Sequence, residues 1–296
     1  MSKSVPHVDV VITGGDDVKL KICTACKLLK YCSVNCQKNH RPHHKKACKN
    51  RMREMWCDDW LFRQPDESYL GNCPICCLPM PLDWSKWCTT SCCFKRYCNG
   101  CSYAHQSRQI DQGLVRRCPF CREPLAKSNE EIEQNTLERV KANDPVALYA
   151  MGASCHREGN YERAFEYWTK AVASGDIEAH YALSVVYDYG QGVEMDEIKQ
   201  VYHLTKAAIG GHPQARYHLG CIDGGNGMHR RAMKHFIIAS NLGHDDALEE
   251  IKMYFSMGIV NEEDYPSALC GHQAAVDATK SAPRDEAEKA RREGLF

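Results

Sequence analysis

The stretches GDIEA at residues 175–179, GHPQA at 211–215 and GHDDA at 243–247 repeat one pattern, a glycine four positions before an alanine. The alanines step by 36 and then 32 residues, and Ala147 extends the series backwards by 32. A larger apolar residue follows each alanine one helical turn later, at Met151, Leu183, Leu219 and Ile251. A second helix in each unit carries its own apolar positions, including Ala164, Phe165, Trp168, Val201, Leu204, Ala232 and Phe236. Two helices in a period of 32–36 residues predict a solenoid.

The segments on either side of the repeats have different patterns. Ser128 and Glu131 match a capping box, which predicts a linker helix over residues 128–143. Residues 281–296 form a strongly charged tail, and we expect a polar cap or a frayed helix there. Three cysteines of this half, Cys155, Cys221 and Cys270, are interpreted as small apolar core residues.

The phrase YDYGQGVEMD at residues 187–196, together with the glycine-to-alanine joints, resembles Sel-one-like repeats, which are relatives of tetratricopeptide repeats. The resemblance covers residues 144–280, and its glycines would close each second helix. It implies a scaffold that binds a protein partner along a concave face and carries no catalysis.

Sixteen of the 19 cysteines lie between Cys23 and Cys121. Such density indicates either disulfides in an oxidising compartment or metal thiolates in a reducing one. Residues 1–22 contain no apolar run like that of a signal peptide, and no later stretch is apolar enough to span a membrane. We therefore expect a cytoplasmic or nuclear protein without a membrane anchor, and metal in place of disulfides.

Charge is divided unevenly between the two halves. Residues 1–127 carry 21 Lys+Arg against 11 Asp+Glu, whereas the remainder carries 17 against 27. This division fits a nucleic-acid face, mutual attraction of the halves, or two solvated surfaces. Seven basic residues between Lys38 and Arg53 could touch phosphate or an import receptor, but we favour a solvated helix face and no nucleic-acid partner.

The first group of metal-ligand residues lies in residues 23–48. Their spacing is Cys23-x2-Cys26, Cys32-x3-Cys36 and His44-x3-Cys48, and short spacings of this kind aim two sulfurs at one ion. The stretch YCSVNCQKNHRPHHKKAC at residues 31–48 resembles the second half of a MYND zinc finger. The resemblance implies that Cys23, Cys26, His44 and Cys48 share one zinc.

Cys32 and Cys36 lack the preceding cysteine pair that completes their site in that family. His7, His40, His43 or Cys57 are the alternative ligands. Arg41 stands where the family usually has the tryptophan of its peptide-docking groove, so peptide binding by this module is not assumed.

The second group lies between residues 73 and 121, in the order Cys73-x2-Cys76, Cys92-Cys93, Cys98-x2-Cys101 and Cys118-x2-Cys121. The branched aliphatic residues of this stretch are few: Ile75, Leu78, Leu82, Ile110, Leu114 and Val115. They cannot form a core that offsets the entropy of the chain. Metal ligation must supply the missing stability, so we expect the segment to unfold without zinc.

The pieces CPIC, CCFKRYCNGC and CPFCR of this stretch resemble a RING finger, whose cysteine pairs are cross-braced, the first with the third and the second with the fourth. The resemblance implies one zinc on Cys73, Cys76, Cys98 and Cys101, and another on Cys118, Cys121 and two ligands of the middle cluster. Lys95 stands where the family commonly has a histidine, and a protonated lysine is no ordinary zinc ligand. We choose Cys92 and Cys93, with Cys88 or His105 as alternatives and Cys77 as a spare thiol.

A RING finger recruits a ubiquitin-conjugating enzyme and has no nucleophile of its own. By resemblance, Ile75 and Pro119 match the recruiting surface, and Arg122 matches the position that restrains ubiquitin by hydrogen bonds. The alternative for Arg122 is an ion pair with a surface carboxylate. His105 stands where many active members present a large apolar residue, which speaks against ligase activity.

The predicted fold class is a multi-domain chain with two small zinc-stabilised modules followed by an all-α helical-repeat solenoid. The segments are 1–22, the MYND-like module 23–48, a linker 49–72, the RING-like module 73–125, the linker helix, the repeats and the charged tail 281–296. Three zinc ions are expected, and a fourth if Cys32 and Cys36 find partners. The preferred function is an interaction adaptor with RING-type ubiquitin ligase activity. The alternatives are a non-enzymatic scaffold and a nucleic-acid regulator acting through residues 38–53.

Overall fold

The computed structural model describes residues 60–259, 261 and 263–295, and in the N-terminal part residues 21–22, 30–31, 35, 38, 42 and 45. The chain divides into two compact units, Met1–Trp60 and Leu61–Phe296. In the first unit, strands β1 (Lys21–Ile22) and β2 (Lys30–Tyr31) pair antiparallel. The predicted ligands of the MYND-like module and most of the basic segment 38–53 lie outside the described residues.

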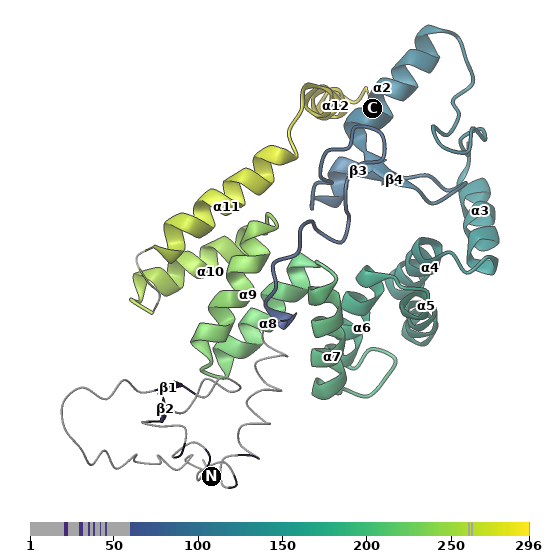
Figure 1. The fold of residues 1–296 in the computed structure, drawn as a ribbon. Coiled ribbons are helices and arrows are strands. Elements are labelled where there is room, and N and C mark those ends of the chain that lie inside the picture. Colours follow the sequence, from purple (N-terminus) through teal and green to yellow (C-terminus); the bar gives the residue numbers. More distant parts are fainter. Residues whose placement is uncertain are drawn as a thin grey trace. The chain divides into compact units, whose positions relative to one another are not determined.

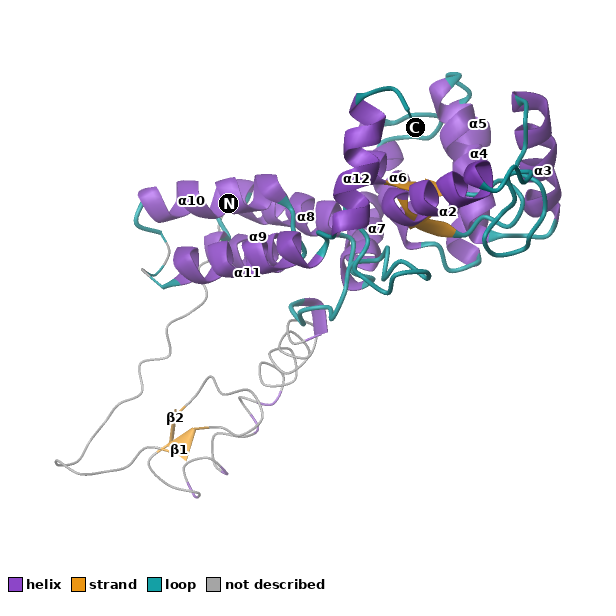
Figure 2. Ribbon diagram, turned by 90° about the horizontal axis from the view of Figure 1, so that it is seen from above, coloured by secondary structure: helices purple, strands orange, loops and turns teal. Residues whose placement is uncertain are grey.

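Eight helices of the second unit build the repeats, and they pack in sequential pairs (Figure 1). Their bounds are α4 (Pro145–Arg157), α5 (Tyr161–Ala173), α6 (Ile177–Tyr189), α7 (Glu197–Ile209), α8 (Pro213–Gly225), α9 (His229–Asn241), α10 (Asp245–Ser256) and α11 (Asp264–Ala278). At the C-terminal end of the repeats, α9 lies side by side with α10 and α11 (Figure 2). None of the helices in the described residues has the length and hydropathy needed to cross a membrane.

The repeated five-residue pattern is the joint between two helices. Gly175 takes a positive φ of 90° after α5, and the backbone N–H of Asp176 donates to the carbonyl of Ala171 at 3.0 Å, which closes the helix in a Schellman motif. The Asp176 carboxylate then accepts from the N–H of Ala179 at 2.7 Å and so caps α6. One glycine and one capping side chain therefore end a helix and begin the next.

The two later joints use the same geometry with a histidine as the cap. Gly211 and Gly243 have positive φ angles of 84° and 90°. Nδ1 of His212 accepts from the N–H of Ala215 at 3.3 Å, and Nδ1 of His244 accepts from the N–H of Ala247 at 3.2 Å. An imidazole can accept at Nδ1 only while that nitrogen carries no proton.

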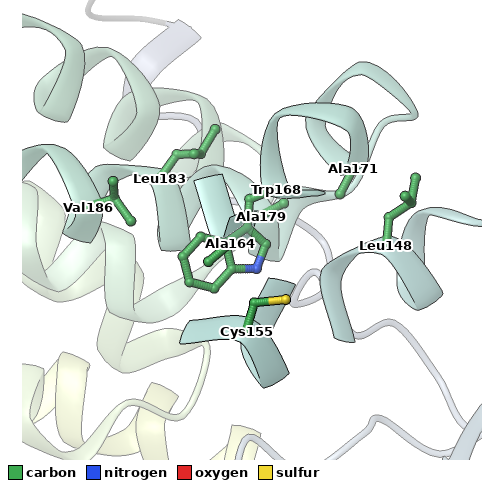
Figure 3. Packing of buried hydrophobic residues seen from close by; sticks show 8 residues of the cluster. All are labelled: Leu148, Cys155, Ala164, Trp168, Ala171, Ala179, Leu183 and Val186. Atoms are coloured by element: carbon green, nitrogen blue, oxygen red, sulfur yellow. The ribbon is translucent and has the colours of Figure 1, made fainter. Parts of the chain in front are cut away.

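The alanines of the pattern form the centre of the repeat core. Ala147, Ala179, Ala215 and Ala247 are all fully buried. In the first repeat, Trp168 packs among Cys155, Ala164 and Leu148 (Figure 3), and a side chain on Gly152 would lie 2.6 Å from its indole ring. Small residues thus let paired helices approach closely and leave room for the large ones.

Two expectations about the repeat core were wrong. Met151 is only half-buried, and Leu148 fills the core in its place. Cys221 and Cys270 are exposed, unlike Cys155. Each lies two positions from a buried residue, Leu219 and Ala268, which places it about 200° around the helix and away from the core.

The cysteine-rich module between residues 73 and 125 has little regular structure. A short 3-10 helix η1 (Trp84–Lys86) leads into strands β3 (Trp87–Thr89) and β4 (Arg96–Cys98), which pair antiparallel with Trp87 opposite Cys98. Helix α2 (Asn99–Asp111) follows directly. Further along, helix α3 (Asn129–Lys141) begins at the cap Ser128, whose hydroxyl accepts from the N–H of Glu131 at 3.3 Å.

The charged C-terminal tail is an ordered part of the fold, contrary to the expectation of a frayed end or a polar cap. Residues Ala282–Arg292 form helix α12, which packs against α2 of the cysteine-rich module (Figures 1 and 2). Ala287 and Ala290 are buried in that contact. The alanine face of this helix packs on the module, and charged residues beside that face bond to the module as well.

The end of the predicted linker 49–72 packs on the repeats as a strap, residues 61–72, which is made mostly of turns, bends and irregular backbone. The carbonyl of Leu61 accepts from the buried guanidinium of Arg216, and the ring of Phe62 lies against His235 at 4.7 Å between centroids. Further on, Tyr69 stacks on His212 at 4.4 Å, and its N–H donates to the carbonyl of Gly211 at 3.0 Å. The strap is therefore part of the folded unit.

We expect Gly211→Ala to lower the free energy of unfolding by roughly 2–3 kcal/mol, and Gly227→Ala by only about 1 kcal/mol. Both glycines end a helix at positive φ, but a Cβ on Gly211 would lie 2.9 Å from the carbonyl oxygen of Glu67 in the strap, whereas Gly227 faces open space. Urea unfolding of the zinc-loaded chain measures both. Equal losses of unfolding free energy in the two variants would mean that the strap leaves room for a side chain at position 211.

Candidate metal centre

Three turns of the cysteine-rich module share one backbone geometry. In the turn at residues 73–78, the N–H of Cys73 donates to the carbonyl of Leu78 at 2.9 Å and the N–H of Cys77 to the carbonyl of Cys73 at 2.8 Å. The turn at residues 118–123 repeats both bonds at 2.8 and 3.1 Å, and the turn at residues 90–95 repeats them at 3.2 and 2.9 Å. The residue after the second metal-ligand position, Cys77, Arg122 or Phe94, has a positive φ in each.

These turns hold paired side chains in a fixed orientation. A positive φ costs a residue other than glycine about 1–2 kcal/mol. Three such residues in one small module therefore indicate that the side chains gathered at its centre constrain the backbone of the turns. In two turns the paired side chains are cysteines, Cys73 with Cys76 and Cys118 with Cys121. In the third, Thr90 stands where the first cysteine would be, and Cys93 is the second.

The first sulfur cluster joins the first and third cysteine pairs. The Sγ atoms of Cys73, Cys76, Cys98 and Cys101 all lie within 4.8 Å of one another. Cys73 and Cys101 are 3.9 Å apart, and Cys76 and Cys98 are 3.8 Å apart. Four sulfurs at the usual Zn–S length of about 2.3 Å form a tetrahedron with edges of about 3.8 Å, so the spacing fits a zinc ion.

The second cluster joins the second and fourth pairs. The Sγ atoms of Cys92, Cys93, Cys118 and Cys121 also lie within 4.8 Å of one another. Cys93 and Cys118 are 3.7 Å apart, and Cys92 and Cys121 are 3.3 Å apart. The hydroxyl of Thr90 lies 3.2 Å from the sulfur of Cys93, so Cys92 supplies the sulfur that Thr90 cannot.

The residues proposed as alternatives lie elsewhere. His105 contacts the carbonyl of Arg117 through Nε2 at 3.0 Å, and the sulfur of Cys88 faces the carbonyl of Tyr97 at 3.8 Å. Cys77 is exposed and belongs to neither cluster. The role of Thr90 was missed by sequence reasoning, although Thr90-x-x-Cys93 has the same spacing as the flanking Cys-x-x-Cys pairs.

Hydrogen bonds to sulfur favour the thiolate form of one cysteine in each cluster, whereas the hydrogen bond with Cys73 raises the pKa of Cys98 and burial raises the pKa values of Cys92, Cys101 and Cys121. A bond from the thiol of Cys98 lowers the pKa of Cys73 to about 4. Burial opposes the ionisation of Cys118, but the backbone N–H groups of Cys121 and Phe120 bring the pKa of that thiol down to about 7. Each cluster therefore contains a thiol poised to lose its proton, as metal ligation requires.

The residues assigned to a ubiquitin-related surface lie in the outer two turns. Ile75 is 44% exposed, whereas Pro119 is half-buried. Arg122 is exposed, and its carbonyl accepts from the guanidinium of Arg117 at 3.0 Å. Within residues 60–259 and 263–295, no carboxylate pairs with the side chain of Arg122.

Comparison with known families matches two parts of the chain. The model of the MYND finger matches residues 13–48, and that of the Sel1 repeat matches residues 145–176, 177–212 and 213–244. A RING-type finger is not among the matched families. The predicted fold class is confirmed: a cysteine-rich, zinc-binding region precedes a helical Sel1 solenoid.

Similar proteins cover only part of the chain. An uncharacterized protein of Neisseria meningitidis serogroup B is 36% identical over 76 residues, which are 25% of this chain and 16% of that protein. The crystal structure of a Sel1 repeat protein from Oxalobacter formigenes has a TM-score of 0.45 at 22% identity, covering 57% of this chain and 51% of that one. The structure of c5321, a protective antigen in uropathogenic Escherichia coli strains displaying an SLR fold, has a TM-score of 0.41 at 22% identity, covering 56% and 37%.

Proposed function

We propose that this chain is a zinc-stabilised adaptor whose repeats bind a partner protein and whose residues 73–125 act as a RING-type module toward a ubiquitin-conjugating enzyme. One observation carries the ligase part of the proposal. The four cysteine pairs are brought together in the order first with third and second with fourth, which is the cross-braced order of RING fingers. A simple pair of sequential zinc knuckles would join neighbouring pairs instead.

The proposed ligand sets follow from the same arrangement. Cys73, Cys76, Cys98 and Cys101 would hold one zinc, and Cys92, Cys93, Cys118 and Cys121 a second. The MYND-like module would hold a third on Cys23, Cys26, His44 and Cys48. Zinc would supply structural cross-links here and no chemistry, because each described cluster offers four thiolates and no open ligand position.

The enzyme-facing surface of this module is supported by exposure and by turn geometry. Ile75 and Pro119 each lie between the two cysteines of a turn, and the two turns have the same backbone hydrogen bonds, so both residues are held rigidly next to a metal-ligand residue. Arg122 follows the last ligand in a fixed positive-φ conformation. A rigid exposed donor beside an apolar contact suits the restraint of a flexible partner chain.

The partner-binding part of the proposal is supported by the matched Sel1 repeats and by an aromatic groove. The groove has a volume of about 360 Å³ and is lined by Trp84 and Trp87 of the cysteine-rich module and by Tyr69, Tyr149 and Tyr181. Trp84 is 76% exposed. Large aromatic side chains at the edge of a groove are frequent anchors in protein interfaces.

The test of the ligase part is autoubiquitination by the purified, zinc-loaded chain with a panel of ubiquitin-conjugating enzymes. We expect Ile75→Ala to reduce the rate at least tenfold with zinc content unchanged, because an exposed apolar contact is lost without a change in the core. Ile110→Ala, at a 64% exposed residue far along α2, is the matched control and should retain the rate.

The second candidate function is a scaffold whose zinc sites only stabilise the fold. It would be favoured if no enzyme of the panel gives ubiquitin chains while elemental analysis shows loaded zinc sites. The nucleic-acid hypothesis concerns residues 38–53, most of which lie outside the described residues, and it stays a prediction.

A further inference from the structure

The C-terminal helix α12 reaches the first sulfur cluster through one arginine. The guanidinium of Arg284 donates to the sulfur of Cys76 at 3.5 Å, although the two residues are 208 positions apart. It also donates to the carbonyl of Leu78 at 3.3 Å, the last residue of the turn that holds Cys76, and to the carbonyl of Pro79, the residue after that turn, at 2.8 Å. A fourth bond, to the carbonyl of Thr279 at 2.6 Å, fixes the side chain from its own end of the chain.

This contact lies on the accessible side of the first cluster. Cys73 and Cys98 are fully buried, whereas Cys76 is exposed. Cys101 is partly exposed. An attacking chelator or oxidant would therefore reach the cluster most readily at Cys76, where the Arg284 guanidinium lies. The second cluster has an exposed sulfur too, at Cys121, but in the described part of the chain no arginine or lysine is hydrogen-bonded to it.

Electrostatics favour a cation at this position when the metal is bound. Four thiolates around Zn²⁺ carry a net charge of −2, and the backbone offers only partial charges: the N–H groups of Cys98 and Cys101 point at sulfur, each at 3.5 Å. A guanidinium, which stays protonated and binds several acceptors at once, neutralises part of the remaining charge. Residues that contact a ligand from outside commonly contribute 10- to 100-fold to metal affinity.

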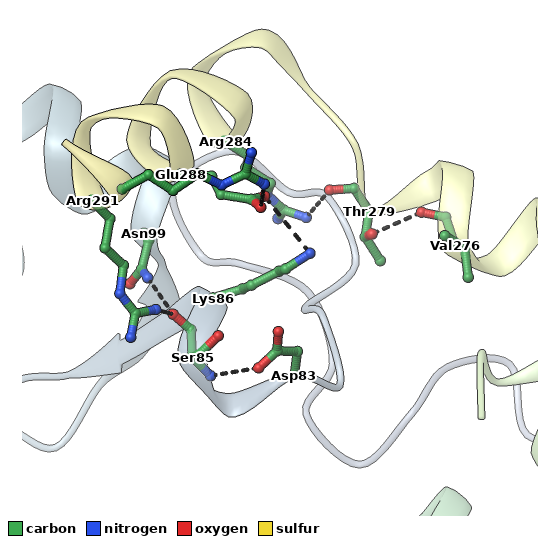
Figure 4. Close-up of polar contacts among 10 residues, drawn as sticks. Asp83, Ser85, Lys86, Asn99, Val276, Thr279, Arg284, Glu288 and Arg291 are labelled. Carbon is green, nitrogen blue, oxygen red and sulfur yellow. Dashed lines mark hydrogen bonds and ion pairs between the residues drawn. The ribbon is translucent and has the colours of Figure 1, made fainter. Parts of the chain in front are cut away.

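Further contacts hold α12 in place over the module (Figure 4). A side chain on Gly100 of α2 would lie 2.8 Å from the backbone nitrogen of Arg284, so the two helices meet without a gap. Arg291 donates to the carbonyl of Ser85, and Lys86 pairs with Glu288 at 3.8 Å. These contacts position Arg284 and keep it from moving away as a free side chain would.

We infer that α12 is a clasp for the first zinc site: Arg284 shields Cys76 and slows metal loss there, while the second site is left open and loses its metal first. The inference rests on the proposed zinc ligation. Because α12 directly follows the last repeat helix, α11, the clasp also ties the metal state of the first site to the far end of the repeats. By linkage, zinc in this site stabilises the docked position of α12.

The experiment follows cysteine alkylation by N-ethylmaleimide in the zinc-loaded full chain after addition of a chelator, with each cysteine located by peptide mass spectrometry. In the wild type we expect Cys121 to react before Cys76 and Cys98. Arg284→Ala should speed the alkylation of Cys76 and Cys98 about tenfold and leave Cys121 unchanged. Arg292→Ala is the matched control, since Arg292 is exposed and, among the described residues, its guanidinium is bonded to Glu288 of its own helix.

Two outcomes separate the clasp from the zinc ligation on which it rests. If elemental analysis finds no zinc in either cluster, the ligand assignment fails before the clasp is tested. If zinc is present and Cys76 reacts equally fast in the wild type and in Arg284→Ala, the clasp alone is overturned. Arg284→Lys guards against a loss of folding: it keeps the charge but not the fork of donors, and should give an intermediate rate.

Discussion

Cys73→Ser is expected to unfold the module of residues 73–125 and to leave the repeat helices α4–α11 intact. The module has almost no core of its own: its central cluster of buried residues is Cys73, Met80, Tyr97 and Cys98, and two of these are metal-ligand residues. Most of its branched aliphatic side chains face solvent, including Ile75, Ile110, Leu114 and Val115. Structural zinc sites contribute about 10–16 kcal/mol of apparent binding energy to small domains, far more than so small a core can supply.

Amide hydrogen exchange measures this effect segment by segment. Cys77→Ser is the matched control, because Cys77 is a neighbouring exposed thiol in neither cluster, and we expect it to preserve protection and zinc content. Cys73→Ser should lose the zinc of both clusters and the protection of residues 73–125, because an unfolded module holds neither ion, and it should release α12 from α2. Exhaustive chelation of the wild type should reproduce this pattern. Full protection of the module after chelation would show that zinc does not hold it.

The repeats were predictable from sequence because each joint is encoded locally. A glycine that closes one helix and a side chain that caps the next must lie one residue apart, so Gly175 with Asp176 and Gly211 with His212 leave a visible pattern. The first joint shows the limit of this code. At this joint Asn143 takes the positive φ of 55° in place of glycine, and Asp144 caps α4. Of the repeated glycine-to-alanine pattern, Ala147 alone is therefore recognisable in the sequence at this joint.

The metal clusters were predictable in composition, whereas their surroundings were not. Spacing indicates which cysteines lie in one turn, but the carbonyls of Leu78 and Pro79, which accept from Arg284, lie more than 200 positions away from it in sequence, and no local pattern encodes such a contact. The packing of the strap on the repeats could not be predicted for the same reason, since Tyr69 and His212 are far apart in sequence and meet only after the repeats have folded. The charged sequence of residues 281–296 therefore gave no sign that its narrow alanine face packs against the cysteine-rich module.

The second large effect is expected in acid, and it follows from the histidine caps. His212 is buried between the rings of Tyr69 and Tyr181, at 4.4 and 4.6 Å. Burial, with the nearby imidazoles of His244 and His218, lowers the pKa of His212 to about 3. Its Nδ1 must stay unprotonated to cap α8, and a positive charge at a helix N-terminus is unfavourable in addition.

Burial likewise lowers the pKa values of other repeat histidines, namely His180, His203, His218, His235 and His244.

The repeats should therefore lose stability as the pH falls below the unfolded-state histidine pKa of about 6.5, and should keep losing it down to about 3, where His212 itself takes up a proton. Since the unfolded chain binds the proton first, His212 alone should cost about 2 kcal/mol at pH 5 relative to pH 7.5. His212→Asn isolates the part of the acid-induced loss of stability that is due to His212, because asparagine caps a helix and does not titrate. At pH 7.5 the variant should be the less stable protein, since it loses the ring stacking with Tyr69 and Tyr181. Urea unfolding at both pH values, with zinc content checked at each, should show the gap to the wild type shrinking by about 2 kcal/mol at pH 5. An unchanged gap would mean that His212 is already charged in the folded protein, which is incompatible with its role as a cap.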